Sequence, residues 1–407
     1  MSEWRTVKIN DVGLIGRGVS YNGTGLNQPG PILVGMGQVQ SDGRLNLSDA
    51  RTYGGKVRPE HFLGEDDIAI VMTDLTQSGQ LLGSPARAPS ALIGKLVVSH
   101  HLQRLRCGPS LEPRFAQYLL MGPDWKSFVQ GMATGTTVRA VSPDDALRFE
   151  FRLPPLVEQR AIAGVLGALD DKIESNRRMA DLLGRLIPLV FQAGIGKFEY
   201  RNLPDVATVQ KGVSYRSVDL QDSDTAMMTL KSFDRNGGYK SDGLKSYVGV
   251  HKPTQVLQPG EIVVAQTDLT QGAEVVGRAV VVPRQSRYQT LIASLDLLIV
   301  RPIEPDNQWF LYGALIQEDF REHCRSRTSG TTVLHLGSDA LPTYQVPWAD
   351  QDVRRAIADE IESLVSMNQS LDQESEKLSA LRDALLPELL SGRTRVRDAE
   401  KAVEEVV

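Results

Sequence analysis

Two five-residue segments of polar side chains are the strongest candidates for chemistry in this chain. Thr-Asp-Leu-Thr-Gln stands at residues 73–77 and again at residues 267–271. A glutamine can make two hydrogen bonds to an adenine edge, and an aspartate can accept one from cytosine. The same aspartate and threonines could instead hold a turn through their own backbone, and a segment shared by both copies fits such a scaffold at least as well. The candidate residues are Thr73, Asp74, Thr76, Gln77, Thr267, Asp268, Thr270 and Gln271.

Two Gly/Thr loops, at residues 134–139 and 328–335, could bind phosphate through backbone N–H and hydroxyl groups, or be ordinary polar loops. A basic residue precedes each copy of Gly-Val-Ser-Tyr and could also contact phosphate, whereas the tyrosines could stack on a ligand or pack in a core. Arg139 follows the first loop and has no basic counterpart after the second. These candidates are Arg17, Tyr21, Thr134, Thr136, Thr137, Arg139, Lys211, Tyr215, Thr328, Thr331, Thr332 and His335.

Motifs for catalysis are missing from the sequence. It contains no GxxxxGK[ST], HExxH or GxSxG, and no Asn/Asp-Pro-Pro-aromatic tetrapeptide of amino-methyltransferases. His100 and His101 are adjacent, but without a Cys/His cluster around them a stray pair is favoured over a metal site. We therefore expect no catalytic residue, metal or cofactor. A metal-dependent nuclease with scattered carboxylates stays open, because such a site carries no compact motif.

Composition excludes some classes of protein and leaves others open. No apolar run approaches the roughly 18 residues of a membrane span, and the first residues lack a signal-peptide pattern. Two cysteines, Cys107 and Cys324, form no CxxC pair and favour a reducing cytoplasm. The net charge is −5, and residues 348–407 alone hold 8 basic and 14 acidic residues. Because the rest is near neutral, charge neither favours nor excludes a nucleic-acid partner.

The chain repeats itself at an almost constant offset. Short identical segments recur in order, 194 or 195 residues apart, which predicts a duplicated unit rather than a short-period solenoid. The matches begin at Gly18, Thr73, Gly83, Gly135, Asp145 and Arg160, and their partners at Gly212, Thr267, Gly277, Gly330, Asp339 and Arg355.

Each copy has the pattern of an α/β (α+β) domain. Short β-branched runs between turn residues predict strands, and longer patterns predict one helix after them. The predicted domains cover residues 1–152 and 196–347. The predicted strands are 67–72, 92–98, 261–265 and 275–282, and the predicted helices are 112–132 and 308–325.

A long helix follows each domain, over residues 153–195 and 348–392. Apolar residues alternate at spacings of four and three, which is a heptad seam with one asparagine near its middle. Each helix could pack only on its own domain. An antiparallel coiled coil with an internal pseudo-twofold is favoured, with Asn176 and Asn368 meeting across the seam and setting its register. The seam positions are Ile162, Leu166, Leu169, Ile173, Asn176, Ala180, Leu183 and Ile187, then Ile357, Ile361, Leu364, Asn368, Leu371, Ser375 and Leu378.

Residues 153–163, 169–176 and 381–392 resemble the two helical regions of specificity subunits of type I restriction-modification systems. The resemblance covers nearly the whole chain, because domain and helix alternate twice. It implies two target-recognition domains that each read half of a bipartite site in double-stranded DNA. It also implies that the helices dock two methyltransferase subunits, with two motor-nuclease restriction subunits completing the complex. Residues 393–407 resemble nothing and are expected to be a mobile tail. A duplicated scaffold that binds only protein is a further alternative.

Overall fold

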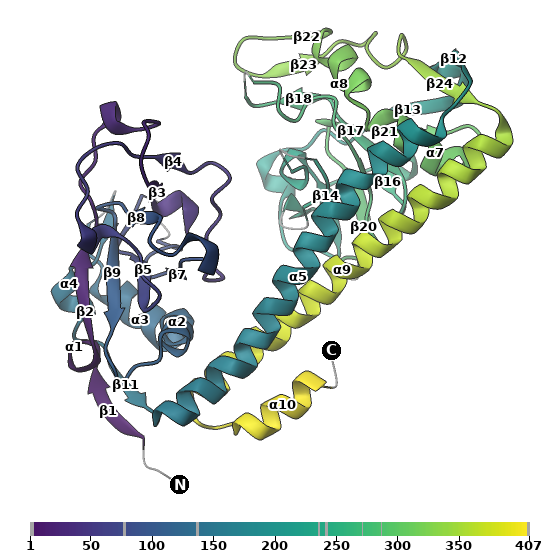
Figure 1. Cartoon of the computed structure of the whole chain (residues 1–407). Coiled ribbons are helices and arrows are strands. Elements are labelled where there is room, and N and C mark those ends of the chain that lie inside the picture. Colours follow the sequence, from purple (N-terminus) through teal and green to yellow (C-terminus); the bar gives the residue numbers. More distant parts are fainter. Residues whose placement is uncertain are drawn as a thin grey trace. The chain divides into compact units, whose positions relative to one another are not determined.

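The computed structural model describes residues 4–75, 79–135, 138–234, 237–240, 243–270, 272–285 and 287–404. The chain divides into two compact units (Figure 1). Unit 1 comprises Met1–Glu174 and Glu376–Val407, and unit 2 comprises Ser175–Ser375. Two long helices, α5 (Leu156–Gly194) and α9 (Gln351–Ser391), contribute one part to each unit. The predicted alternation of mixed α/β domains and long helices is confirmed.

The globular part of unit 1 is built on a four-stranded antiparallel sheet of order β2-β9-β5-β7. A three-stranded sheet of order β4-β3-β8 includes a parallel pair, and two small pairs, β1-β11 and β6-β10, complete the strands. The strands are β1 (Arg5–Lys8), β2 (Gly13–Arg17), β3 (Ile32–Val34), β4 (Arg51–Thr52), β5 (Asp67–Val71), β6 (Thr73–Asp74), β7 (Pro85–Arg87), β8 (Leu96–Val98), β9 (Leu102–Cys107), β10 (Arg139–Ala140) and β11 (Glu150–Leu153). The helices are α1 (Ile9–Val12), α2 (Pro113–Met121), α3 (Pro123–Met132) and α4 (Pro143–Ala146).

Unit 2 repeats this plan, with four-stranded sheets of order β13-β21-β17-β19 and β15-β14-β20-β16, a three-stranded sheet of order β18-β23-β22, and the pair β12-β24. Its strands are β12 (Phe198–Asn202), β13 (Ala207–Lys211), β14 (Thr225–Met228), β15 (Lys245–Ser246), β16 (Val256–Leu257), β17 (Ile262–Ala265), β18 (Thr267–Asp268), β19 (Ala279–Val281), β20 (Thr290–Ala293), β21 (Leu297–Pro302), β22 (Thr328–Ser329), β23 (Leu334–Leu336) and β24 (Gln345–Ala349). Its helices are α6 (Leu203–Val206), α7 (Gln308–Leu315) and α8 (Glu318–Arg325).

Residues 68–71 of β5 and the whole of β17 are apolar because both faces of these strands are covered. In β5, Ile68 and Ile70 pack into one core and Ala69 and Val71 into another. The same division occurs in β17, where alternate residues belong to two different cores. Side chains alternate between the two faces of a strand, so a doubly covered strand reads as a continuous apolar run. The strands predicted at 67–72 and 261–265 are therefore confirmed, whereas those predicted at 92–98 and 275–282 are shorter and cover only Leu96–Val98 and Ala279–Val281.

Each predicted 18- to 21-residue helical stretch is two helices in the structure. Between α2 and α3, Gly122 is extended and Pro123 occupies the first turn of the next helix. A proline disfavours continuation of a helix and favours its first turn, because it has no N–H to donate and its ring clashes with the preceding turn. Between α7 and α8, Gln317 is likewise extended, and its side chain donates to the Gly313 carbonyl at 2.7 Å. The predicted single helices are therefore wrong in continuity but correct in position.

The long helices pair antiparallel within each unit. In unit 1, Leu169 and Ile173 of α5 pack on Leu378 of α9. In unit 2, Phe191 of α5 shares a core with Ile357 of α9. Seam positions toward the helix ends, such as Ile162 and Ile357, also lie in the cores of the globular domains. The heptads therefore serve both predicted purposes, pairing of the helices and packing on a domain. The helices pair with one another, and each end packs on a globular domain.

The asparagine pair predicted at the seam is wrong. Asn176, which is 3% exposed, donates to Glu374 Oε2 at 2.8 Å. Asn368 donates to the Ala180 carbonyl at 2.8 Å. Each amide therefore bonds across the helix pair, but to a different partner. Pairing the helix midpoints misplaces the register, because a heptad seam alone fits several staggers.

The expected mobile tail is also wrong over most of its length. Helix α10 covers Val396–Glu404 (Figure 1). Ala399 is fully buried, and Val403 packs on the core that holds Leu169 and Leu378. Val396, Ala399 and Val403 are spaced three and four apart, which places them on one face of the helix. This segment thus covers the helix pair of unit 1.

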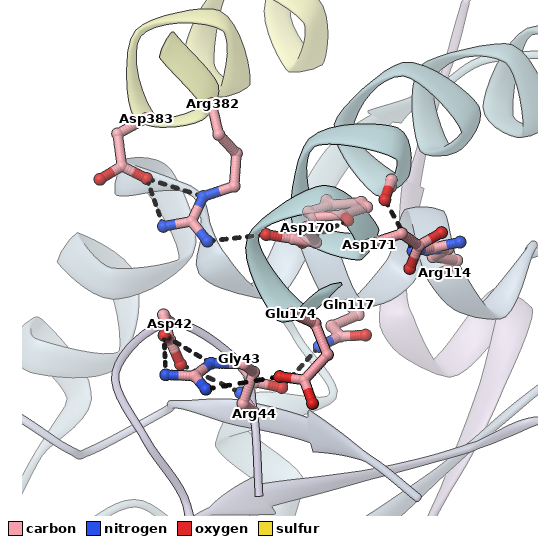
Figure 2. Close-up of polar contacts among 12 residues, drawn as sticks. Asp42, Gly43, Arg44, Arg114, Gln117, Asp170, Asp171, Glu174, Arg382 and Asp383 are labelled. Carbon is pink, nitrogen blue, oxygen red and sulfur yellow. Dashed lines mark hydrogen bonds and ion pairs between the residues drawn. The ribbon is translucent and has the colours of Figure 1, made fainter. Parts of the chain in front are cut away.

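Polar contacts fasten the globular part of unit 1 to its helices (Figure 2). Arg114 of α2 donates to the Gly167 carbonyl at 3.0 Å and to Asp171 at 2.7 Å. The neighbouring Tyr118 hydroxyl donates to Asp170 at 2.5 Å, and the same carboxylate accepts from Arg382 of α9 at 2.8 Å. Three helices therefore meet at one aspartate.

Candidate nucleic-acid interface

In each unit the structure brings the two predicted polar segments together. Strand β6 pairs with β10, which places Thr73 opposite Ala140 and Asp74 opposite Arg139. In unit 2, β18 pairs with β23, so that Thr267 lies opposite His335. The Thr-Asp segment and the Gly/Thr loop are therefore neighbouring strands of one small sheet in both copies.

The two motif aspartates hold the loop that follows them. Asp74 is 2% exposed and accepts from the Leu81 N–H at 2.8 Å. Asp268 is equally buried and accepts from Val275 N at 2.5 Å and from Thr270 N at 2.8 Å. Burial acts to raise the pKa of Asp268, but these hydrogen bonds outweigh it and hold that pKa below its ordinary value. Both carboxylates accept from backbone N–H groups seven residues ahead, which favours the scaffold alternative.

The Gly-Val-Ser-Tyr segments lie beside equivalent strands in the two copies, β8 in unit 1 and β20 in unit 2. Val19 N donates to the Val98 carbonyl at 2.7 Å, and Val213 N donates to the Ala293 carbonyl at 2.7 Å. Arg17 is exposed at the end of β2, and Lys211 is exposed at the end of β13. Both basic residues are thus available to a phosphate partner from equivalent positions.

The two tyrosines of this motif are half-buried. The Tyr21 ring lies 5.4 Å from the His100 ring and 6.3 Å from the Tyr53 ring. Tyr215 packs beside Val213, and burial together with the nearby Asp296 raises its pKa. Both tyrosines therefore pack against neighbouring side chains.

A four-residue turn, residues 99–102 in unit 1 and 294–297 in unit 2, lies beside the residue that precedes the Thr-Asp strand. Met72 N donates to the His101 carbonyl at 3.1 Å, and Leu102 N donates to the Ser99 carbonyl at 2.9 Å. In unit 2, Gln266 N donates to the Asp296 carbonyl and Leu297 N to the Ser294 carbonyl, both at 2.9 Å. The motif tyrosine, the turn, the Thr-Asp strand and the Gly/Thr hairpin are therefore adjacent in both copies.

Several predicted loop residues are committed to internal bonds. Arg139 donates to the Gln130 side chain at 2.7 Å, and Thr328 donates to the Arg325 carbonyl at 2.8 Å. Thr134 donates to the Ala140 carbonyl at 3.4 Å, and Thr270 donates to Asp268 at 2.8 Å. Exposed candidates are Arg17, Thr134, Lys211, Thr331, Thr332 and His335. Five other candidates, Thr76, Gln77, Thr136, Thr137 and Gln271, lie outside the described residues.

The central residues of the turn are not among the predicted site residues, although two of them are the adjacent histidines that the sequence disfavours as a metal pair. They are His100 and His101 in unit 1, and Leu295 and Asp296 in unit 2. The repeat offset of 195 would have aligned them, because Ser99 and Leu102 match Ser294 and Leu297. A search for shared residues passes over positions where the two copies differ.

Metal ligands and cysteine thiols are possible catalytic groups. In the part of the chain that it describes, no group of three or more His, Cys, Asp or Glu side chains could hold a metal ion. Cys107 and Cys324 are free and buried, and burial raises the pKa of each thiol to about 12. Among the described residues, no helix is long and apolar enough to cross a membrane.

Several known proteins that are similar in sequence or fold are specificity subunits of type I restriction-modification systems. The MjaVIII type I restriction enzyme specificity subunit of Methanocaldococcus jannaschii is 20% identical over 301 residues, which are 67% of this chain and 68% of that protein. The crystal structure of the type I restriction-modification S subunit from M. genitalium matches with a TM-score of 0.56 at 16% identity, over 95% of this chain and 96% of that one. The HsdS subunit from Thermoanaerobacter tengcongensis aligns over 97% of this chain and 98% of that one, at 17% identity and a TM-score of 0.38.

No protein-family profile matches the sequence. The homologous sequence covers two thirds of the chain, and the M. genitalium structure shares the fold over almost all of it. The resemblance read from the sequence is thus confirmed: this chain is similar in sequence to one specificity subunit of a type I restriction-modification system and shares its fold with another.

Proposed function

We propose that the chain is the DNA-recognition subunit of a type I restriction-modification complex. Each globular domain, residues 1–152 and 196–347, reads one half of a bipartite site in double-stranded DNA. The long helices dock two methyltransferase subunits, and two motor-nuclease restriction subunits complete the assembly, in the cytoplasm. The chain itself is non-catalytic and uses no cofactor.

One observation supports this function above the others. The two domains hold the same loop frame, with matching backbone hydrogen bonds at Val19 and Val213 and at Met72 and Gln266. Within that frame some exposed residues differ between the copies, as His100 of unit 1 and Leu295 of unit 2 do. A reader of two different half-sites needs this combination, because phosphate contacts position a protein while base contacts specify the sequence.

The test is a map of methylated bases across a genome that carries the candidate methyltransferase subunit, with and without this chain. We expect a two-part motif with a non-specific gap that disappears when the chain is removed. A methylation pattern unaffected by the chain would refute the proposal. Metal-dependent cleavage by the purified chain would then indicate a nuclease, and subunit binding without DNA affinity a protein scaffold.

An apolar stripe on α5 supports the docking of a partner helix. Met179, Leu182, Leu186 and Leu189 are 45–55% exposed, at spacings of three, four and three residues. This spacing places them on one face of the helix. An exposed row of large apolar side chains is typical of a surface that another protein covers. We assign the stripe to a helix of the methyltransferase subunit.

Replacing Leu182 and Leu186 with Glu should weaken binding of the methyltransferase subunit by about 30-fold or more, because charges then occupy an apolar contact. The affinity can be measured by calorimetry. Ser370→Glu adds a charge to an exposed position of α9 and serves as the control. Equal affinities of the double variant and the control would remove the stripe from the interface.

A further inference from the structure

The turn at residues 99–102 and its counterpart at 294–297 have matching backbone hydrogen bonds but different central side chains. Both turns close by a hydrogen bond of 2.9 Å between their first and last residues. A motif glycine packs against each, since a Cβ on Gly18 would lie 2.0 Å from the Ser99 oxygen and one on Gly212 the same distance from the Ser294 oxygen. The backbone of the turn is therefore fixed in both units.

The central residues of the two turns share nothing in charge or shape. Unit 1 has two imidazoles whose ring centroids lie 4.0 Å apart, with the His100 ring beside Tyr21. Unit 2 has Leu295, which is 44% exposed, and Asp296, which accepts from the Thr267 hydroxyl at 2.9 Å. Residues around them recur in both units, namely the tyrosine, the threonine and a basic residue.

Resting on the proposed function, we propose that the two central residues of this turn select bases in each half-site: His100 and His101 in unit 1, Leu295 and Asp296 in unit 2. Residues common to both domains cannot distinguish two half-sites, whereas these can. Their neighbours Arg17 and Lys211 are exposed and suited to phosphate, which would bring the turn against a groove.

The chemistry of each pair indicates a base. The Asp296 carboxylate only accepts, so it fits the cytosine N4 amino group, and Leu295 fits the thymine methyl group. Burial and the neighbouring His100 lower the pKa of His101, which keeps that imidazole neutral at pH 7 with one donor. A ring N–H donor fits the N7 acceptor of a purine. We therefore expect a purine contact in the half-site of unit 1 and a cytosine contact in that of unit 2.

The experiment exchanges the two pairs inside the full chain, together with its methyltransferase subunit. His100→Leu with His101→Asp should change the specified bases at one or two positions of one half-site, with discrimination altered by about 10-fold or more. Leu295→His with Asp296→His should change only the other half-site. The unchanged half in each case is an internal control, read from the same methylation map.

Lys8→Ala is a matched external control, because Lys8 forms an exposed ion pair with Glu150 elsewhere in unit 1. His100→Ala, at an exposed position, replaces the exchange if the double variant does not fold. An unaltered base preference in both half-sites, or a slower methylation with the same motif, would overturn the inference. Absence of any bipartite motif with the unaltered chain would instead overturn the proposed function, so the two failures are distinguishable.

Discussion

Arg382→Met should lower the free energy of unfolding of unit 1 by about 3 kcal/mol. The Arg382 side chain is 7% exposed and lies between two carboxylates, Asp170 at 2.8 Å and Asp383 at 2.8 Å (Figure 2). Burial acts to lower its pKa, but the bonds to both carboxylates outweigh this and raise it. Removal of the guanidinium leaves Asp170, which is 26% exposed, charged without its cationic partner.

The loss of stability should arise from the unpaired charge on Asp170. Adding Asp170→Asn to Arg382→Met should recover part of the loss, since an amide oxygen can still accept from Tyr118. Urea unfolding of the full chain, with hydrogen exchange to report the two units separately, gives the comparison. Arg185→Met is the control, because it removes an exposed ion pair with Asp181 within α5. It should lower the free energy of unfolding by less than about 1 kcal/mol. A loss no larger than that of the control would show that Arg382 does not support unit 1.

The repeat predicted most of the architecture. Segments matched at an offset of 194 or 195 residues required two similar folds, and the structure gives matching sheet orders around β5 and β17. Heptads predicted that α5 and α9 pair. They could not fix the stagger, because shifting one helix by a heptad keeps the same seam. Only side-chain contacts, such as Asn176 to Glu374, choose among the staggers.

The site was predicted in part, for a physical reason. Shared residues identify what holds the frame, and Asp74 and Asp268 do hold it through buried hydrogen bonds. Two domains that recognise different DNA sequences must differ at the residues that contact bases. A search for repeated motifs finds only the residues that the two domains share. His100 was therefore visible only as half of a stray pair until the backbone placed it beside Tyr21.

Gly18→Ala should destabilise the loop frame of unit 1 by about 3 kcal/mol, and Gly212→Ala should do the same in unit 2. The new methyl group would lie 2.0 Å from a backbone carbonyl oxygen in each case, at Ser99 and at Ser294. These oxygens belong to the turns and cannot move away like the end of a flexible side chain. The hydrogen bonds of Val19 and Val213 to the neighbouring strand would be lost with the displacement.

The consequence for function should be confined to one half-site for each variant. Methylation mapping should show relaxed base preference in the half read by unit 1 for Gly18→Ala, and in the other half for Gly212→Ala. Gly23→Ala is the matched control, because a Cβ there meets nothing within 4 Å and should change stability by no more than about 0.5 kcal/mol. If Gly18→Ala matched this control in both stability and motif, the close packing of the glycine against the turn would not be what fixes the recognition loops. If Gly18→Ala relaxes base preference in one half-site and Gly212→Ala in the other, the rigidity of each turn determines the bases that its own domain selects.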